Sequence, residues 1–390
     1  MVVENSYPND IRVRKEANHL SKWYNITVIA IKRKSEKFFE VIDGVSIIRI
    51  PELPDIDLGR IRYMLEYFYF TSVSVIIFLG TVPFKRYRVV HVHNPPDTLF
   101  VLGILCKIFR IKFIFDHHDL APNLYQTRFS ERKDFLYKML IQCERFSCKL
   151  ANVIIATNNT YKQIEIERHG INPDKIFIVR NNPIIEECII GDNSNAVSTA
   201  SLPNTKTLLF IGAINPQDGL GILLKVVHLL VNKFNEKGFV CNIVGGGDSL
   251  AEAKKIAADL KVEDYVNFTG IIYDRELIKQ YLHSADIGLE PAPENSLNLH
   301  STFIKVMEYM AAGIPTVAFD LKETRFSAGD SAILIPPGNV EAFAEAVKKL
   351  LDDDVLRNKM GKTGSERINN ELNWEVSAGN LKKAYDMVFA

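Results

Sequence analysis

Two charged side chains, Lys305 and Glu308, interrupt a stretch from residue 301 to residue 313 that is otherwise mostly apolar. On a helix, side chains three residues apart lie on one face. A charge on a helix that is apolar nearly all round, and hence buried, is costly unless a partner compensates it. A nucleotide could compensate both charges. A lysine beside a helix N-terminus suits a diphosphate, and a glutamate about 4–5 Å further along could accept hydrogen bonds from ribose hydroxyls. The alternative is an internal salt bridge on a half-exposed helix, and this stretch alone leaves both interpretations open.

The ends of this helix carry residues that usually start and stop helices. Ser301 and Thr302 are favourable N-cap residues, and Gly313 followed by Pro315 is a typical stop signal. We therefore expect a helix of about three turns between them. Ser301 is four residues before Lys305 and should share its face.

A second polar cluster follows two apolar runs in the first half of the chain. One group contains His91, His93 and Asn94, and the other is Asp116-His-His-Asp119. His91 and His93 should lie on one face of a strand, because they are two residues apart. Such a cluster at a strand end indicates a functional site more often than an isolated histidine does. A zinc site would show three or four ligands at a recognisable spacing, so we expect no metal here.

The elements that must position these groups follow a regular alternation. Short β-branched runs alternate with helical patterns, which predicts a parallel sheet covered on both faces. Ligands of such sheets bind beyond the C-terminal strand ends, where both histidine groups lie. The chain starts almost inside a first strand, which is therefore short or lacks its natural beginning. Further strands are expected at 26–31, 45–50, 88–93, 111–116, 152–157 and 176–180, and helices at 11–22, 60–82, 97–109, 131–150 and 158–169.

The alternation restarts after a polar stretch of small residues. Residues 191–206 have the composition of a linker or loop. Two serial sets of parallel strands predict an α/β protein with two Rossmann-like domains, which we place at 1–183 and 184–372, followed by a C-terminal helical stretch at 373–390. The second set of strands is expected at 207–211, 239–244, 265–269, 286–289, 316–319 and 332–335.

Length and composition agree with a two-domain globular protein. The chain has 390 residues, of which 47% are hydrophobic and 24% charged. Residues 1–183 contain 27 basic and 19 acidic residues, whereas residues 184–390 contain 20 and 28. A basic half indicates contact with something anionic, such as a membrane surface or a phosphorylated acceptor, and we find no nucleic-acid motif. No signal peptide is recognisable. Reduced, buried thiols in a cytosolic protein are expected for the cysteines at 106, 143, 148, 188 and 241.

Residues 61–84 are unusually rich in aromatic and apolar side chains. The uncharged part, 67–84, falls short of the roughly 20 predominantly apolar residues that cross a bilayer. A long core helix is the interpretation that we favour. The alternative is a helix partly immersed in an anionic leaflet, which the flanking basic residues would support.

The run Ser301-Thr-x-x-Lys-Val-Met-Glu-Tyr-Met-Ala-x-Gly-x-Pro315, preceded by Ala285-Asp-Ile-Gly-Leu-Glu-Pro291, resembles the donor-nucleotide site of family 4 retaining glycosyltransferases. The resemblance covers nearly the whole chain. It implies the GT-B fold, in which two Rossmann-like domains face each other across a cleft and the final helix crosses back to the first domain. No cofactor is expected, because the lysine takes the electrostatic role that metals play elsewhere.

The resemblance also implies roles for individual residues. Lys305 would neutralise the leaving diphosphate and Glu308 would hold the ribose. The family's His-Asp pair, carried onto His118 and Asp119, would face donor sugar and acceptor. Further binding residues are implied around them, with the glycines near the nucleotide and the isoleucines lining the base pocket: His93, Asn94 and Asp116 (with His117 beside them), Gly212, Gly245, Gly246, Ile271, Ile272, His300, Ser301 and Thr302.

This chain departs from the family pattern at the diphosphate. Most members carry an arginine and a lysine where this chain has Ala213 and Asp218. Diphosphate binding would then depend more heavily on Lys305, on helix N-terminal amides and on the region of Arg12.

A second departure concerns the sugar. The family has two glutamates eight positions apart, and the position eight residues before Glu308 is His300. The task of the missing glutamate would fall to His300, Glu294, Asn298 or the backbone.

The resemblance implies retaining transfer of a hexosyl or N-acetylhexosaminyl group from a nucleotide diphosphate sugar, UDP rather than GDP. The acceptor would be a glycan or a polyprenyl-diphosphate-linked sugar in cell-surface polysaccharide or glycoconjugate synthesis. The protein would be cytoplasmic or peripheral on the inner face of the cell membrane, touching it through residues 61–88. Replacing Lys305 or Glu308 by alanine should weaken nucleotide binding without unfolding the protein. Two alternatives remain: a nucleotide-sugar 2-epimerase, which needs further acid/base carboxylates, and a degenerate scaffold subunit.

Overall fold

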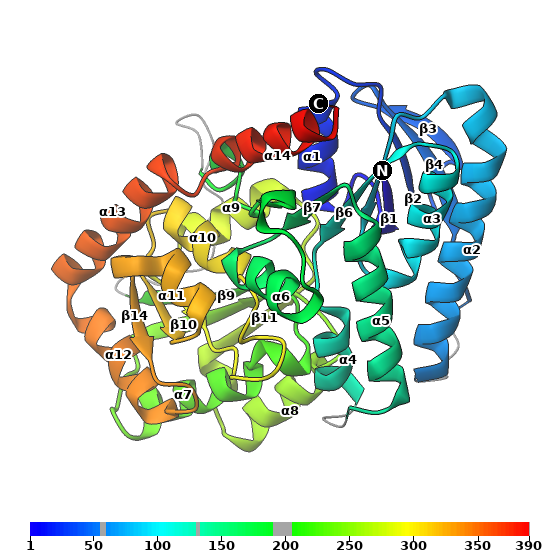
Figure 1. Cartoon of the computed structure of the whole chain (residues 1–390). Coiled ribbons are helices and arrows are strands. Elements are labelled where there is room, and N and C mark those ends of the chain that lie inside the picture. Colours follow the sequence, from blue (N-terminus) through cyan, green and yellow to red (C-terminus); the bar gives the residue numbers. More distant parts are fainter. Residues whose placement is uncertain (55–59, 130–132, 190–204, 390) are drawn as a thin grey trace. The chain divides into compact units, whose positions relative to one another are not determined.

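The chain folds into two compact units, each with its own sheet and hydrophobic core (Figure 1). The computed structural model describes residues 1–54, 60–129, 133–189 and 205–389. Unit 1 comprises Met1–Asn181 with Ser377–Ala390, and unit 2 comprises Asn182–Val376. An α/β protein with two parallel-sheet domains is therefore confirmed. The stretch predicted to be a linker, 191–206, lies outside the described residues except for its last two positions.

The sheet of unit 1 has eight strands in the order β3-β4-β2-β1-β5-β6-β7-β8. All neighbours are parallel except β3, an antiparallel edge strand that we did not predict. Its Phe39 and Val41 are 73% and 67% exposed, so β3 lacks the buried apolar run from which the other strands could be identified. The strands are β1 Val2–Ser6, β2 Thr27–Lys32, β3 Phe39–Ile42, β4 Val45–Pro51, β5 Val89–His93, β6 Lys112–His117, β7 Val153–Ala156 and β8 Ile176–Ile178.

Helices cover both faces of this sheet. Val90 and Val92 of β5 pack in the cluster that contains Leu102 and Cys148, from α3 and α5. His91, between those valines, points to the opposite face, where its Nδ1 atom contacts the hydroxyl of Tyr385. The short α4, directly after the Asp-His-His-Asp sequence, was not predicted. The helices are α1 Ile11–Leu20, α2 Arg60–Lys85, α3 Phe100–Ile108, α4 Ala121–Phe129, α5 Phe135–Leu150, α6 Asn159–His169 and, shared by both units, α14 Trp374–Phe389.

The long helix α2 is not the core helix that we favoured. It buries one face, including Phe70 and Phe78, and exposes apolar side chains on the other, with Phe68 72% and Ile76 67% exposed. Only 28% of the most apolar 18-residue segment of this helix is buried. Among the described residues, Ile61–Lys85 is long and apolar enough to cross a membrane, although core helices of soluble proteins pass the same test. The even distribution of aromatic residues around this helix concealed which face is buried.

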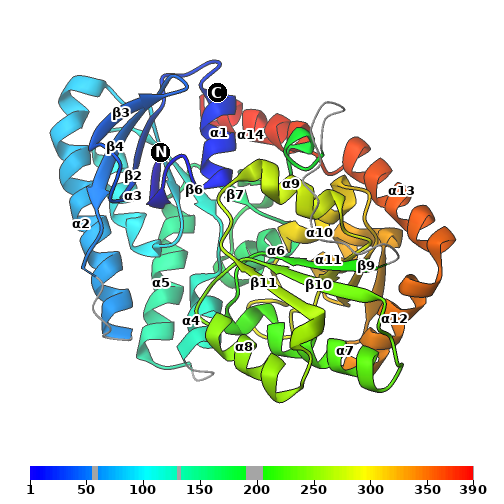
Figure 2. The ribbon, with the colours of Figure 1, turned by 180° about the vertical axis from the view of Figure 1, so that it is seen from behind.

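The sheet of unit 2 has six parallel strands in the order β11-β10-β9-β12-β13-β14. Three of them, β9, β10 and β11, are labelled in Figure 2. Alternate residues of β9 pack into two different clusters: Leu208 with α7 and α12, and Leu209 with α10. The strands are β9 Lys206–Ile211, β10 Phe239–Val244, β11 Val266–Gly270, β12 Ile287–Glu290, β13 Thr316–Phe319 and β14 Ala332–Ile335. The helices are α7 Leu220–Asn232, α8 Leu250–Asp259, α9 Arg275–His283, α10 Ile304–Ala311, α11 Lys322–Ala328, α12 Val340–Asp352 and α13 Asp354–Asn370. All five cysteines are buried and free, as expected.

Candidate functional site

Helix α10 is shorter than predicted and begins differently. Its N-cap is Phe303, which supplies no side-chain hydrogen bond, so the prediction that Ser301 or Thr302 caps the helix is wrong. The hydroxyl of Ser301 instead donates to the carbonyl of Leu297 at 3.0 Å, because the preceding turn brings that acceptor within reach. The predicted stop is present, with Gly313 in the left-handed region at φ 71°. The N-cap side chain thus offers no acceptor to the first-turn amides, and helix N-terminal amides suit an anion.

Lys305 is buried and paired with a carboxylate that sequence reasoning missed. Its Nζ atom lies 3.0 Å from Glu290 Oε2 and 4.2 Å from the centre of the Phe210 ring. The alternative of an internal Lys305–Glu308 salt bridge is therefore not what the structure shows. Lys305 also lies directly over Gly212, where an added Cβ would be 3.2 Å from the lysine Cε. The amine is thus held above the turn that follows β9.

Two acids surround this amine. Glu290, at the end of β12, is buried and accepts a hydrogen bond from the backbone N–H of Ala292. Burial raises the pKa of Glu290, while the Lys305 charge opposes that shift. Asp218, at the position of the family's lysine, accepts from the N–H of Asn215 at 3.0 Å, and burial raises its pKa against the pull of Lys305. Asp218, which stands where the family usually has a lysine, therefore accepts a hydrogen bond within its own turn.

Glycines bring the backbone of neighbouring turns close together beside Lys305. At Gly245, φ is 146°, and a Cβ there would lie 1.8 Å from the carbonyl oxygen of Gly212. A Cβ on Gly246 would lie 2.6 Å from the side chain of Ile271, which is itself 60% exposed. The structure therefore brings these four predicted residues together with Lys305 at the C-terminal ends of β9, β10 and β11.

The remaining predicted residues of unit 2 have different surroundings. Glu308, His300, Thr302 and Ile272 are half-buried. Asn298 is buried, and its side-chain nitrogen donates to the carbonyls of Gln217 and Pro293, both at 2.8 Å, so both of its donor hydrogens join neighbouring loops. The other substitute for the missing glutamate, Glu294, is exposed.

In unit 1, Asn94 holds the second cluster together. Its side-chain oxygen accepts from the backbone N–H groups of His118 and Asp119 at 2.6 and 3.3 Å. Its amide donates to the Asp119 carbonyl at 2.6 Å and to Asp97 Oδ1 at 3.1 Å. Burial raises the pKa of Asp97 to about 8, which favours the protonated acid at neutral pH. Asn94 thus serves as a positioning residue for the His118-Asp119 pair.

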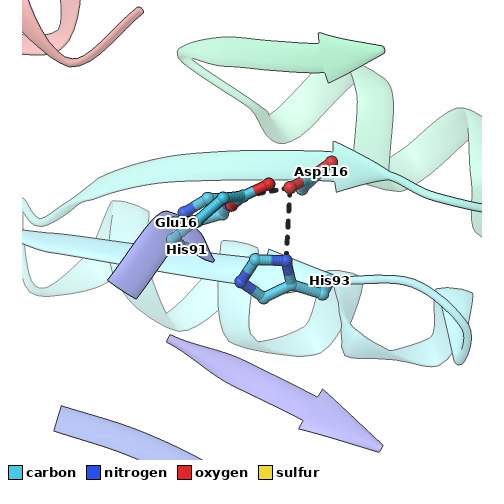
Figure 3. Close-up of side chains that lie close together, drawn as sticks. All are labelled: Glu16, His91, His93 and Asp116. Atoms are coloured by element: carbon cyan, nitrogen blue, oxygen red, sulfur yellow. Dashed lines mark ion pairs between the residues drawn. The ribbon is translucent and has the colours of Figure 1, made fainter. Parts of the chain in front are cut away.

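Three imidazole rings surround one oxygen of Asp116. Asp116 Oδ2 lies 3.3 Å from His91 Nε2, 3.2 Å from His93 Nδ1 and 3.0 Å from His118 Nε2. The rings of His91 and His93 stack with centroids 4.2 Å apart, which confirms that they share a face. Figure 3 shows the side chains of His91, His93 and Asp116 converging with that of Glu16, which comes from α1.

Protonation in this cluster is set by burial and mutual charge. Burial, followed by the charge of Asp116, raises the pKa of Glu16, although Arg12 acts in the opposite direction. For Asp116, burial would raise the pKa, but the charge and contacts of His118, with those of His91 and His93, lower it well below its usual value. Burial also lowers the pKa of His91 and His93. At neutral pH these shifts favour a neutral Glu16, an ionised Asp116 and two neutral imidazoles.

His117, the neighbour of the predicted pair, does not join this cluster. It points to the other side of the sheet, where its Nδ1 atom lies 2.9 Å from Glu165 Oε1 and its Nε2 atom 3.7 Å from Glu144 Oε2. This is the expected alternation along a strand. His117 therefore belongs to a separate buried ionic network.

Sequence reasoning missed four residues of these clusters: Glu16, Asp97, Glu290 and Tyr385. Asp97 and Glu290 stand within the stretches that we singled out, and their position at strand ends was a usable signal. Glu16 and Tyr385 lie on helices far away in sequence, and no local pattern distinguishes them from solvent-facing residues.

Comparison with known families covers both units. The family model described as "Glycosyltransferase Family 4" matches residues 11–181, and that described as "Glycosyl transferases group 1" matches residues 205–353. The chain is 25% identical over 299 residues to D-inositol 3-phosphate glycosyltransferase of Corynebacterium glutamicum, covering 74% of this chain and 69% of that protein. It is 32% identical over 199 residues to phosphatidyl-myo-inositol mannosyltransferase of Mycobacterium leprae, covering half of each.

Solved structures share the fold over nearly the full length. Sucrose-phosphate synthase from Thermosynechococcus elongatus superposes with a TM-score of 0.79 at 19% identity, covering 99% of this chain and 94% of that one. Anabaena Alr3699/HepE in complex with UDP-glucose superposes with a TM-score of 0.74 at 13% identity, covering 99% of this chain and 98% of that one. The fold is that of GT-B glycosyltransferases. With family models matching in both units, this chain belongs to glycosyltransferase family 4.

Proposed function

We propose that this protein is a retaining glycosyltransferase that transfers a hexosyl or N-acetylhexosaminyl group from a nucleotide diphosphate sugar, UDP in preference to GDP. The observation that carries the proposal is the arrangement around α10. An ammonium group stands above a glycine turn at a helix N-terminus whose N-cap residue, Phe303, makes no side-chain cap bond, and a glutamate follows one turn further along. This combination offers cations and N–H donors to a diphosphate and an acceptor to a ribose. The UDP-glucose complex of Anabaena Alr3699/HepE, which shares this fold, supports the choice of base.

The chemistry follows from these groups. The bond between the sugar anomeric carbon and the diphosphate oxygen breaks, and a bond from the acceptor hydroxyl oxygen forms on the same face. The acceptor proton passes to the departing phosphate oxygen. Lys305 and the first-turn amides of α10 stabilise the charge that develops on the leaving group. His118, oriented by Asp116 and Asn94, hydrogen-bonds the transferred sugar, with Asp119 toward the acceptor.

Titration of the purified protein with UDP, GDP and their sugar conjugates tests the donor, with thermal stability as readout. A ligand at 100 times its Kd stabilises a protein by about 2.7 kcal/mol. We expect a rise in Tm with the UDP series and a smaller or no rise with the GDP series. Absence of a shift with every nucleotide would contradict the donor site.

Replacing Glu308 by alanine is expected to weaken UDP binding about 10–100-fold while leaving Tm without ligand nearly unchanged. The reason is that a hydrogen bond to a charged group contributes about 1.5–3 kcal/mol, and a half-buried helix position tolerates alanine. Isothermal titration with UDP measures the change. Glu345→Ala, an exposed glutamate on α12 of the same unit, is the matched control and should bind like the wild type. Unchanged affinity of a folded Glu308→Ala variant would remove this residue from the site.

We further propose that the acceptor is a glycan or a polyprenyl-diphosphate-linked sugar used in cell-surface glycoconjugate synthesis, and that unit 1 meets the cytoplasmic face of the membrane through α2. An apolar groove of about 600 Å³ runs along the exposed face of α2, lined by Met64, Phe68, Ile76, Phe100 and Met139 among others. Exposed basic residues Lys85 and Arg86 follow at the helix end. Apolar area next to positive charge fits an anionic lipid surface.

Replacing both Phe68 and Ile76 by glutamate is expected to reduce binding to anionic phospholipid vesicles at least 10-fold. Each of these exposed side chains would gain about 1.5–3 kcal/mol when buried in lipid, and the new charges are repelled. Co-sedimentation with vesicles measures the bound fraction, and vesicles of neutral lipid should bind less. Val355→Glu, an exposed apolar residue of unit 2, is the control. Failure of the wild type to bind anionic vesicles would overturn the proposed contact.

A second candidate is a degenerate transferase that serves as a binding or scaffold subunit. Two observations favour it. The acids Glu290 and Asp218 partly neutralise the charge of Lys305, which was predicted to bind the diphosphate. In addition, Ala213 stands where the family usually has an arginine. Assay of donor hydrolysis by the purified protein separates the two. Release of UDP from a UDP-sugar by the wild type, with a raised KM in the Glu308→Ala variant, would exclude the scaffold.

A further inference from the structure

Four buried side chains of unit 1 point their ligand atoms at one small volume. Glu16 comes from α1, His91 and His93 from β5, and Asp116 from β6. Each is at most 1% exposed, and one ligand atom from each lies within 4.8 Å of all the others. Figure 3 shows a ring nitrogen of His93 directed at the carboxylate of Asp116. Among the described residues, this is the one group of histidine, cysteine and acid side chains with metal-ligand geometry.

Six polar atoms of this group are buried without a hydrogen-bond partner, whereas the Nδ1 atoms of the two rings have one: His91 Nδ1 contacts the Tyr385 hydroxyl at 3.0 Å and His93 Nδ1 contacts His118 Nε2 at 3.1 Å. Both oxygens of Glu16, both of Asp116 and the Nε2 atoms of His91 and His93 are buried without a hydrogen-bond partner. Asp116 Oδ2 is close enough to the rings for hydrogen bonds, but the direction of approach does not satisfy one. Buried polar groups are normally paired, and an unpaired buried carboxylate is especially costly. So many orphaned atoms around one point indicate that a ligand is needed there.

We propose that Glu16, His91, His93 and Asp116 bind one divalent transition-metal ion of the zinc type. Two carboxylates balance the charge of a divalent cation, and two neutral imidazoles complete a set of four ligands. Imidazole nitrogens favour zinc-like ions over magnesium or calcium. Asp116 Oδ2 lies 3.3 Å from His91 Nε2 and 3.2 Å from His93 Nδ1, which matches the roughly 3.4 Å edge of a tetrahedron with metal–ligand bonds of about 2.0–2.1 Å. Metal binding at His93 Nδ1 would replace the present contact of that atom with His118 Nε2. The distance of 3.9 Å between His91 Nε2 and Glu16 Oε2 would have to shorten only slightly for both atoms to bind one ion.

The surroundings of the site indicate a structural ion. The hydroxyl of Tyr385 lies 3.0 Å from His91 Nδ1, so the second ring nitrogen is held by an outer partner, as is usual for metal-bound histidine. With every ligand buried, the ion would be closed to substrate. Its position would tie α1, β5 and β6 together and fix Asp116, which in turn contacts His118. The proposal does not depend on the transferase activity.

The test uses the full chain, purified without chelator or affinity metal. Elemental analysis should find close to one zinc-type ion per chain. Removal of the ion by a strong chelator should lower Tm, and Zn²⁺ alone should restore it. In the chelator-treated protein, Co²⁺ should give the intense visible absorption of a tetrahedral site. A protein free of metal whose Tm responds to neither Zn²⁺ nor chelator would overturn the proposal and favour a hydrogen-bonded cluster with neutral Glu16.

Variants locate the ion. Glu16→Gln keeps the shape of the side chain and should weaken Zn²⁺ binding at least 10-fold, and His91→Ala should do the same. His283→Ala removes an exposed histidine of unit 2, and Glu165→Gln removes a buried carboxyl next to a histidine outside the cluster. Both controls should retain the ion. Equal metal content in Glu16→Gln and the wild type would place the ion elsewhere and overturn the assignment. The Co²⁺ spectrum of the wild type keeps the test valid if a variant fails to fold.

Discussion

Replacing Lys305 by alanine is expected to lower the free energy of unfolding by about 3–5 kcal/mol and to abolish measurable sugar transfer. The first effect arises because Glu290 would remain buried without its partner at 3.0 Å. The second arises because the leaving diphosphate would lose its nearest cation. The variant should still fold and bind nucleotide more weakly, as the sequence predicts, but the buried partner adds a loss of stability. Denaturant unfolding and a transferase assay measure the two effects.

The two roles of Lys305 can be separated by neutralising both partners. In Lys305→Met with Glu290→Gln, most of the lost stability should return, since replacing both members of a buried pair is nearly neutral, but transfer should stay absent. Lys279→Ala, which breaks a surface pair with Glu276, should change stability by no more than about 1 kcal/mol. A double variant that binds UDP like the wild type would show that Lys305 is not a diphosphate ligand.

The stability loss of Lys305→Ala should also depend on pH. Burial raises the pKa of Glu290 in the folded state, and removal of Lys305 would raise it further. A folded protein that holds a proton which the unfolded chain releases becomes less stable as pH rises. The deficit relative to the wild type should therefore grow from pH 5 to pH 8. A deficit that is constant over this range would mean that the lysine contributes by packing alone.

Replacing His118 by alanine is expected to reduce kcat about 10²–10³-fold while UDP affinity changes less than twofold. His118 is held by Asn94 and Asp116, and a positioned donor of this kind stabilises charge in the transition state by several kcal/mol. The nucleotide groups belong to the other unit, so binding of UDP alone should not report the loss. Steady-state kinetics with a UDP-sugar, together with UDP titration, measure both quantities.

His283→Ala is the matched control for His118→Ala, because it removes an exposed histidine that belongs to neither cluster. Its kcat should equal that of the wild type. If His118→Ala transferred sugar at the wild-type rate, the role carried over from the family would be wrong. If it lost UDP affinity as well, His118 would contribute to donor binding and not to the reaction step alone.

The local sequence pattern was sufficient to predict most strands and helices of both units. The alternation of apolar strands and helices predicted both parallel sheets within a few residues, since burial on two faces demands continuous β-branched runs. Strand-end positions singled out His91, His93 and Asp116, because parallel strands place their C-terminal ends along one edge. The family signature at residues 301–315 was sufficient to identify Lys305 and Glu308 as candidate site residues.

Errors arose where a residue has competing partners. Ser301 is a good cap by composition, but its hydroxyl donates to the carbonyl of Leu297, and Phe303 stands at the N-cap position of α10. The helix α2 could not be assigned a buried face, because its aromatic residues surround the axis. The strand β3 pairs only at an edge and leaves its apolar residues exposed, so it has no burial pattern to recognise.

The partners of the buried charges could not be found in the chain alone. Lys305 meets Glu290 fifteen residues away, and Asp116 meets Glu16 a hundred residues away, across separate elements. Periodicity and propensity act over one or two turns, so they predict which segments become strands and helices and which strand ends carry polar groups. Which acid neutralises which base depends on how those segments pack, because burial and distance set the electrostatic energy, and neither exists before the chain has folded.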